Sequence, residues 1–339
     1  MTTNQTDLAG RPLRAAVVGV GYLGRFHAQK YKAIEGVDLV GVVDADSERS
    51  RRVAQELEVD FYSDLKDLTG KVDLVSVVTP TQSHFEIAGA CLKAGWHVLV
   101  EKPITVTIPE ADGLIALADQ KKLVLQVGHL KRFHPAVVAL NESGVLETPR
   151  FIESLRFAPF KSRALDVDVV LDLMIHDVDL ILNFVGSEMV QVDAVGTRVV
   201  TNQVDIANAR LKFANGCTAN VTASRVARDS TRRIRLFQDN AFLSLDFIRN
   251  DIMVLQRGRG VQELDGIEVP AIEETTIPIQ KYDTLEAEIR SFCEVVRDNK
   301  PPLVSGRDGR KALEVVNAIQ ESIEANTRNI GLEGMPGLT

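Results

Sequence analysis

The chain is poor in cysteine, which limits its covalent chemistry and the compartments that suit it. Its 339 residues include three cysteines, Cys91, Cys217 and Cys293, which lie far apart. Three widely spaced cysteines provide neither a disulfide framework nor the paired spacing of zinc and redox sites. We therefore expect no metal site and a reducing, cytoplasmic location.

Long apolar runs and an excess of basic residues are also lacking. The first twelve residues are polar, without the apolar core of a signal peptide, and no segment has the composition of a membrane span. The chain has 39 lysines and arginines against 47 aspartates and glutamates, which gives a net charge of −8. A negative chain is poorly matched to a phosphate backbone, so we expect neither a nucleic acid nor a membrane as partner.

The length is enough for two domains, and the hydrophobic pattern changes between them. Up to about residue 128, short apolar strands alternate with helical patterns, which predicts an α/β domain with a doubly wound parallel sheet of the Rossmann type. From residue 190 the period becomes two, which predicts an α+β domain with a large, mainly antiparallel open sheet. We place these domains at residues 12–128 and 129–339.

A glycine-rich turn near the start of the chain indicates a dinucleotide site. A strand at 14–18 leads into a G-x-G-x-x-G motif and a helix, and a second strand at 37–43 ends at Asp44, 20 residues after the last glycine. The turn supplies Gly19, Gly21, Tyr22, Leu23 and Gly24. Such glycines allow a tight turn and close approach of a pyrophosphate to the helix start.

Asp44 indicates which dinucleotide is bound. Its carboxylate can accept hydrogen bonds from ribose hydroxyls but would repel a 2′-phosphate, so we expect NAD in preference to NADP. Ser47, Arg49 and Arg51 follow closely. They either soften that preference or form an exposed helix start.

Two further strands carry candidate ligands at their carboxyl ends, where doubly wound sheets bind their ligands. Thr79 and Pro80 end one strand, and Glu101-Lys102-Pro103 ends the next. Lys102 is either a donor to a reacting oxygen or an ordinary surface lysine. The first role would place it beside both cofactor and substrate.

Residues 168–186 read as a buried helix, with Asp168 as N-cap and Gly186 just past its end. Four polar residues interrupt its apolar sequence at a spacing of 4, 3 and 4, which places them on one face. They are Asp172, His176, Asp179 and Asn183. Buried ionisable groups are costly unless they are paired or used, so this face is either a satisfied network or an active-site wall. The dinucleotide motif upstream favours the second.

Taken together, these motifs resemble the Gfo/Idh/MocA family of sugar oxidoreductases. The resemblance rests on residues 19–24, the TPTQSH run at 79–84, Glu101-Lys102-Pro103 and the Asp172…His176…Asp179 helix. It covers nearly the whole chain and implies hydride transfer between NAD(P) and a sugar-like alcohol. Many members have glycines before the Asp and a small residue between Asp and His, where this chain has Val169, Val170 and Met174.

The resemblance also assigns residues to roles. Lys102, Asp172 and His176 fall on the family's catalytic positions: His176 takes the hydroxyl proton, Asp172 orients its ring, and Lys102 donates to the oxygen. Beyond the glycine turn and Asp44, the expected cofactor contacts are Thr79, Pro80, His84, Glu101 and Lys102.

Residues 127–135 and 172–177 resemble the branch that acts on nucleotide sugars, in particular UDP-N-acetylglucosamine 3-dehydrogenases. Expected substrate ligands are Lys102, Lys131, Arg132, Arg163, Asp172, His176 and Arg225. Arginines between 225 and 235 would either clamp a diphosphate or keep an exposed hairpin soluble, and Lys131 and Arg132 would either meet an anionic group or be solvated.

Three alternatives stay open at this point. They are a dehydrogenase of a free sugar or cyclitol such as inositol, an oxidoreductase that retains and recycles its cofactor, and a non-catalytic NAD-sensing regulator. The resemblance further implies a homodimer or homotetramer that pairs through the open sheet.

Overall fold

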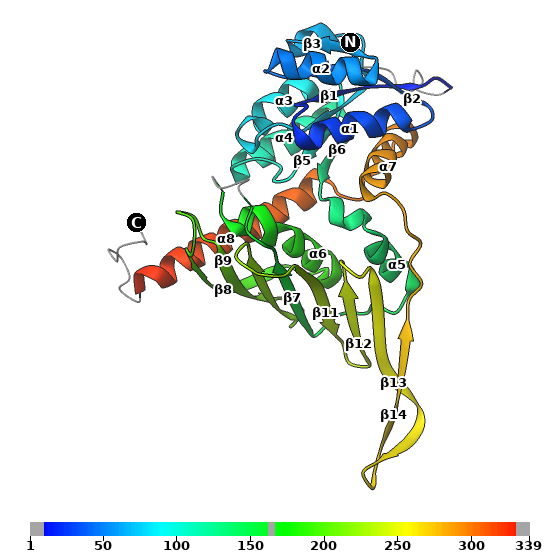
Figure 1. Ribbon diagram of the computed structural model, residues 1–339, viewed down its shortest axis with the longest axis vertical. Helices are drawn as coiled ribbons and strands as arrows, with labels where there is room; N and C mark the ends of the chain where they lie inside the picture. The colour runs from blue at the N-terminus through cyan, green and yellow to red at the C-terminus, as the bar shows by residue number, and fades with distance from the viewer. Residues whose placement is uncertain (1–9, 162–166, 330–339) are drawn as a thin grey trace. The chain divides into compact units, whose positions relative to one another are not determined.

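The computed structural model describes residues 10–161 and 167–329. The chain divides into two compact units, each described here by itself. The first unit comprises Met1–Phe133 and Tyr282–Leu313, and the second comprises His134–Lys281 and Glu314–Thr339. In Figure 1 the orange helix α7 (Thr284–Asp298) lies beside the blue helix α1 (Tyr22–Ala33) of the same unit.

The first unit contains a six-stranded parallel sheet in the order β3-β2-β1-β4-β5-β6, as predicted for a Rossmann domain. The strand order reverses between β1 and β4, so the carboxyl ends of these strands open on the crevice in which such sheets bind ligands. The strands are β1 (Leu13–Val18), β2 (Val37–Val43), β3 (Asp60–Tyr62), β4 (Leu74–Val77), β5 (His97–Glu101) and β6 (Leu125–Gly128). The short edge strand β3 was not predicted.

Helices connect these strands, and their ends follow local capping signals. The remaining helices are α2 (Ser47–Leu57), α3 (His84–Ala94) and α4 (Ile108–Lys121), with 3₁₀ turns at Leu65–Leu68, Thr81–Ser83 and Leu130–Phe133. Asp46 caps α2 by accepting from the Arg49 N–H, and Thr107 and Glu110 form a reciprocal capping box at the start of α4.

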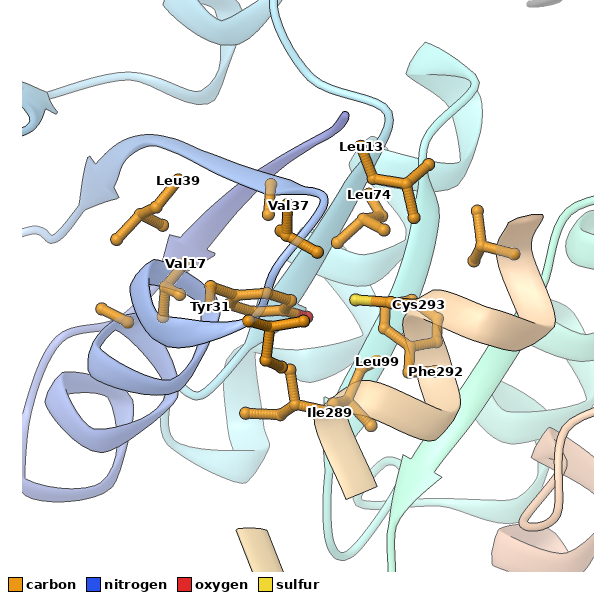
Figure 2. Packing of buried hydrophobic residues seen from close by; sticks show 14 of the residues in the cluster. Leu13, Val17, Tyr31, Val37, Leu39, Leu74, Leu99, Ile289, Phe292 and Cys293 are labelled. Atoms are coloured by element: carbon orange, nitrogen blue, oxygen red, sulfur yellow. The ribbon is translucent and has the colours of Figure 1, made fainter. Parts of the chain in front are cut away.

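The first unit also includes a C-terminal segment, which differs from the predicted division at residue 128. Figure 2 shows Ile289, Phe292 and Cys293 of α7 packed with Tyr31 and Leu13. All five side chains are buried. An amphipathic pattern shows which face of a helix is buried but not which sheet covers it. The sequence therefore assigned α7 to the second domain, whereas the structure has it in the first unit. Helix α8 (Gly306–Asn329) begins in the first unit and ends in the second.

The second unit contains an eight-stranded sheet in the order β14-β13-β12-β11-β7-β10-β9-β8. Neighbouring strands are antiparallel except for the central pair β7–β10, so the prediction of a mainly antiparallel sheet is confirmed. The strands are β7 (Phe151–Phe157), β8 (Met189–Thr197), β9 (Ile206–Phe213), β10 (Thr218–Ser224), β11 (Thr231–Phe237), β12 (Ala241–Asp246), β13 (Asp251–Leu264) and β14 (Ile267–Thr276). Residues 257–276 are rich in charge and glycine, so the sequence did not reveal the long β13–β14 hairpin.

Two helices of the second unit lie over one face of its sheet, α5 (Pro135–Ser143) and α6 (Ile175–Val185) (Figure 1). The strands alternate accordingly. On β11, Ile234 and Leu236 are fully buried, whereas Phe237 is 38% exposed on the opposite face. One face of the sheet therefore forms the core of this unit, and the other stays open within the described residues.

Candidate active site

The glycine turn between β1 and α1 leaves its backbone accessible at one point. Gly19 has φ +86°, and a Cβ there would lie 2.5 Å from the Val78 carbonyl oxygen. A Cβ on Gly24 would overlap the Gly19 carbonyl oxygen, whereas a Cβ on Gly21 would meet nothing within 4 Å. Gly19 and Gly24 are thus required by the fold. The space in front of Gly21 is open, beside the first amides of α1, and it suits the close approach of a phosphate group.

Asp44 lies at the end of β2 and holds the turn. One carboxylate oxygen accepts from the Val20 N–H at 2.8 Å, and the other accepts from the Asp46 N–H at 2.9 Å. The Arg49 guanidinium approaches the same carboxylate to 3.4 Å. The carboxylate is 7% exposed and has remaining lone pairs, so it can also accept from ribose hydroxyls.

Lys102 follows directly on β5 and is half-buried. Its backbone N–H donates to the Glu101 carboxylate at 3.2 Å, and the Lys102–Pro103 peptide is cis. The structure therefore places the predicted lysine at the carboxyl end of a central strand, where the sheet topology puts ligands.

His84 connects this loop with the one after β4. Its Nδ1 lies 2.8 Å from the Pro103 carbonyl oxygen and its Nε2 lies 2.8 Å from the Thr79 carbonyl oxygen. The side chain is 1% exposed. His84, predicted as a cofactor contact, thus braces the two loops that carry Thr79, Pro80 and Lys102.

In the second unit, the helix around Asp172 begins and ends where the sequence predicted. Asp168 accepts from the Leu171 N–H at 2.9 Å, and Gly186 has φ +58°. The expectation of a continuous α-helix was wrong, because Val170–Met174 forms a π-helical turn before α6. Wide turns of this kind, closed by i→i+5 bonds, are frequent at functional sites. Asp172 lies within this turn, and no proline or glycine marks it in the sequence.

Burial along this helix separates core residues from candidate catalytic ones. Val169, Val170 and Met174, which depart from the family pattern, are fully buried. Asp172 and His176 are half-buried. The bulky residues therefore belong to the core, while the predicted base His176 and its orienting residue Asp172 keep partial access to solvent.

A buried ion pair that the sequence did not reveal fixes α6 on the sheet. The Asp177 carboxylate accepts two bonds from the Arg156 guanidinium of β7, at 2.6 and 2.7 Å. Both side chains are almost fully buried. A bidentate ion pair of this kind fixes both the distance of α6 from the sheet and the rotation of α6 about its axis.

The predicted substrate ligands are in different surroundings. Arg225 is 5% exposed and donates to the carbonyl oxygens of Val167, at 2.6 Å, and Val204, at 3.4 Å, so its contacts brace the backbone before Asp168. In the first unit, Lys131 is half-buried and Arg132 is buried. Arg163 lies outside the described residues.

The arginines of β11 do not form one flexible clamp. Arg233 pairs with Asp246 at 2.8 Å, and Arg235 pairs with Glu153 at 2.7 Å. Both belong to the open face of the sheet, while Arg232 alternates to the other face. These pairs match the reading of a charged surface rather than that of a diphosphate site.

Within residues 10–161 and 167–329, no helix is both long and apolar enough to cross a membrane. Across the same residues, no cluster of three or more His, Cys, Asp or Glu side chains is arranged to hold a metal ion.

Comparison with known proteins gives two family matches and full-length relatives. Residues 13–129 match an oxidoreductase family with an NAD-binding Rossmann fold, and residues 142–244 match the GFO/IDH/MocA C-terminal domain. A UDP-N-acetylglucosamine 3-dehydrogenase from Acidithiobacillus ferrooxidans is 43% identical, over 92% of this chain and 98% of its own length. Its solved structure, with the same coverage of both chains, gives a TM-score of 0.87.

Inositol dehydrogenases are more distant. A myo-inositol 2-dehydrogenase from Thermotoga maritima is 30% identical over 96% of this chain and 100% of its own length. A scyllo-inositol dehydrogenase from Lactobacillus casei, solved with NAD(H) and scyllo-inositol, shares the fold with a TM-score of 0.77 at 21% identity, over 93% of this chain and 98% of its own. Because both domains match the family and full-length relatives share it, the chain belongs to the Gfo/Idh/MocA family of oxidoreductases, whose first domain is an NAD-binding Rossmann fold.

Proposed function

We propose that the protein is an NAD-dependent dehydrogenase that oxidises the 3-hydroxyl of UDP-N-acetylglucosamine. The observation that carries this proposal is 43% identity with a UDP-N-acetylglucosamine 3-dehydrogenase along nearly the whole chain. The inositol dehydrogenase with full coverage reaches 30%. The half-buried Asp172 and His176 and the strand-end Lys102 support catalysis, which a redox-sensing regulator would not need.

The first unit fits NAD. The open space at Gly21 and the free amides at the start of α1 suit the pyrophosphate, and Asp44 suits the adenosine ribose. A 2′-phosphate would face the Asp44 carboxylate, so we propose NAD rather than NADP as the cofactor. Thr79, Pro80, His84 and Glu101 complete the proposed cofactor set, His84 and Glu101 through the loops that they hold. NAD, when bound, supplies the acceptor for the hydride.

The protein's own residues handle the proton and the developing charge. His176 accepts the proton of the reacting hydroxyl, because an imidazole changes its protonation state near neutral pH. Asp172, one turn earlier, orients the ring and stabilises its cation. The Lys102 ammonium donates to the reacting oxygen and offsets the negative charge that forms there. Lys131, Arg132 and Arg163 are proposed for the diphosphate.

A substrate comparison tests this function. Purified protein is mixed with NAD and UDP-N-acetylglucosamine, and NADH absorbance is followed, with a transaminase present to remove the keto product. We expect sustained NADH formation with this substrate and little with myo-inositol or a simple hexose. Turnover of myo-inositol alone would move the assignment to the free-cyclitol branch, and tight NAD binding without any turnover would support a sensor.

We also propose that the open sheet face pairs subunits into a homodimer or homotetramer in the cytoplasm. This face carries an open depression of about 680 Å³ that is lined by Phe237 and Phe242 together with the paired Arg233 and Arg235. The rings of Phe237 and Phe242 lie 4.9 Å apart. Light scattering gives the mass in solution, and a Phe242→Glu variant should lower it if this face is the interface.

A further inference from the structure

A buried network of polar side chains lies next to the loop that carries Lys102. His27 of α1 is fully buried, with Nδ1 3.2 Å from Ser76 Oγ and Nε2 3.2 Å from Glu101 Oε1. Ser76 Oγ also lies 2.8 Å from the Tyr31 hydroxyl. The contact between His27 Nε2 and Glu101 is within ion-pair distance, but its geometry is not that of an aligned hydrogen bond. This polar network thus joins helix α1 to strands β4 and β5.

The Glu101 carboxylate, at one end of this polar network, is enclosed on several sides. Its Oε2 accepts from the Lys102 N–H at 3.2 Å. On β6, a Cβ added to Gly128 would lie 2.8–3.0 Å from the carboxylate atoms. Burial works to raise the pKa of Glu101, but the contact and charge of His27 and those of Lys102 outweigh it and hold that pKa below its usual range. The Glu101 carboxylate is therefore negatively charged and is held against the backbone at the end of its own strand β5.

Tyr31, at the other end of the polar network, is also held in place. Figure 2 shows the Tyr31 ring among Val17, Val37 and Ile289 in the hydrophobic cluster, where it is fully buried. The Tyr31 hydroxyl is hydrogen-bonded to Ser76 Oγ, which in turn contacts His27 Nδ1. Buried polar groups are often less stabilising than apolar residues of similar volume, so their value here lies in the geometry that they fix.

We propose that His27 is a positioning residue for Lys102. Through Glu101 it fixes the backbone at residues 101–102, and thereby the direction in which the Lys102 side chain leaves the strand. This inference rests on the proposed catalytic role of Lys102. It assigns the helix that follows the phosphate-binding turn a second task, which is to hold the catalytic lysine.

Two substitutions of His27 separate positioning from mere packing. A glutamine amide reaches the position of His Nε2 and can still donate to Glu101, whereas an asparagine amide reaches only the position of Nδ1. We expect His27→Asn to lower kcat for UDP-N-acetylglucosamine by about tenfold or more, because small misplacements of catalytic groups are costly. His27→Gln should restore most of that loss in kcat.

Gly128→Ala approaches the same contact from the opposite strand. Its Cβ displaces the Glu101 carboxylate while His27 stays intact, so kcat should fall as in His27→Asn. His97→Asn is the matched control. His97 is another largely buried histidine, at the opposite end of β5, where its Nδ1 accepts from the Val124 N–H at 3.0 Å, and its replacement should leave kcat unchanged.

Lys102→Ala separates a failure of the proposed function from a failure of the inference about His27. If wild type shows no turnover, or if Lys102→Ala turns over like wild type, the proposed catalytic role of Lys102 is wrong and the inference fails with it. If Lys102→Ala is inactive but His27→Asn and Gly128→Ala turn over like wild type, positioning by His27 is wrong. Equal losses of kcat in His27→Asn and His27→Gln would also overturn it.

Discussion

At the scale of single residues, the proposed reaction depends on Lys102 and His176. Replacement of Lys102 by Met or of His176 by Gln should lower kcat by at least about 10²-fold, because each removes a group that acts on the reacting oxygen or its proton. The Kd of NAD should be preserved in the His176 variant, since His176 is proposed to act on the substrate alone. Steady-state rates of NADH formation, with calorimetry for NAD, measure both effects. Turnover close to wild type in either variant would refute that residue's role.

Two glycines of the same turn should respond in opposite ways. Gly21→Ala adds a methyl group that meets nothing in the protein, so its Tm should stay near that of wild type while its Kd for NAD rises. Gly24→Ala places its methyl group onto the Gly19 carbonyl, so it should destabilise the first unit. Thermal unfolding and NAD titration of both variants test this. A Gly21→Ala protein that binds NAD as tightly as wild type would show that no phosphate group approaches there.

At the scale of elements, the position of α6 depends on the ion pair between Arg156 and Asp177. Asp177→Ala leaves a buried guanidinium without its carboxylate, which costs about 3–5 kcal/mol in the free energy of unfolding. The double variant Arg156→Met, Asp177→Leu should recover much of that loss, because it removes both charges. Denaturant unfolding of the three proteins measures this. A single variant as stable as wild type would contradict the structural role of the pair.

The elements also show what the sequence can predict. Regular alternation and clear caps located α2 at 47–57 and α7 at 284–298, and the glycine motif with Asp44 located the nucleotide turn. The π-helical turn around Asp172 was not predictable, because its residues suit an α-helix equally well. Nor was the β13–β14 hairpin, whose exposed strands need no apolar alternation.

Within the candidate site, the sequence predicted the positions of side chains that follow from the order of strands and helices. Lys102 and Asp44 lie at strand ends, as expected from the order of strands and helices. Contacts made across the fold were not predictable, such as Arg225 with the Val167 carbonyl or His27 with Glu101, because nothing in local spacing indicates which distant residue a buried polar group meets.

At the scale of the whole molecule, buried carboxylates set the stability toward acid. Burial works to raise the pKa of Asp205, but hydrogen bonds from the Thr201 hydroxyl and from the N–H groups of Val200, Val199 and Thr201 lower it to about 2. A pKa below that of the unfolded chain means stability that is present above about pH 4 and lost as the pH falls toward 2.

The expected size of this contribution is about 2 kcal/mol in the free energy of unfolding. Asp205→Asn should be less stable than wild type at pH 7, and the difference should shrink as the pH falls from about 4 to about 2. Urea unfolding across this range measures it. A stability difference that is independent of pH would show that the lowered pKa of Asp205 does not contribute.

The proposed function requires that this protein moves a hydride from carbon 3 of the sugar to NAD. The most direct measurement uses UDP-N-acetylglucosamine with deuterium at carbon 3 and determines the mass of the reduced cofactor. We expect that the NADH carries one deuterium and forms more slowly than with the unlabelled sugar. NADH without deuterium, or a deuterated sugar that remains unconsumed while myo-inositol is oxidised, would contradict it.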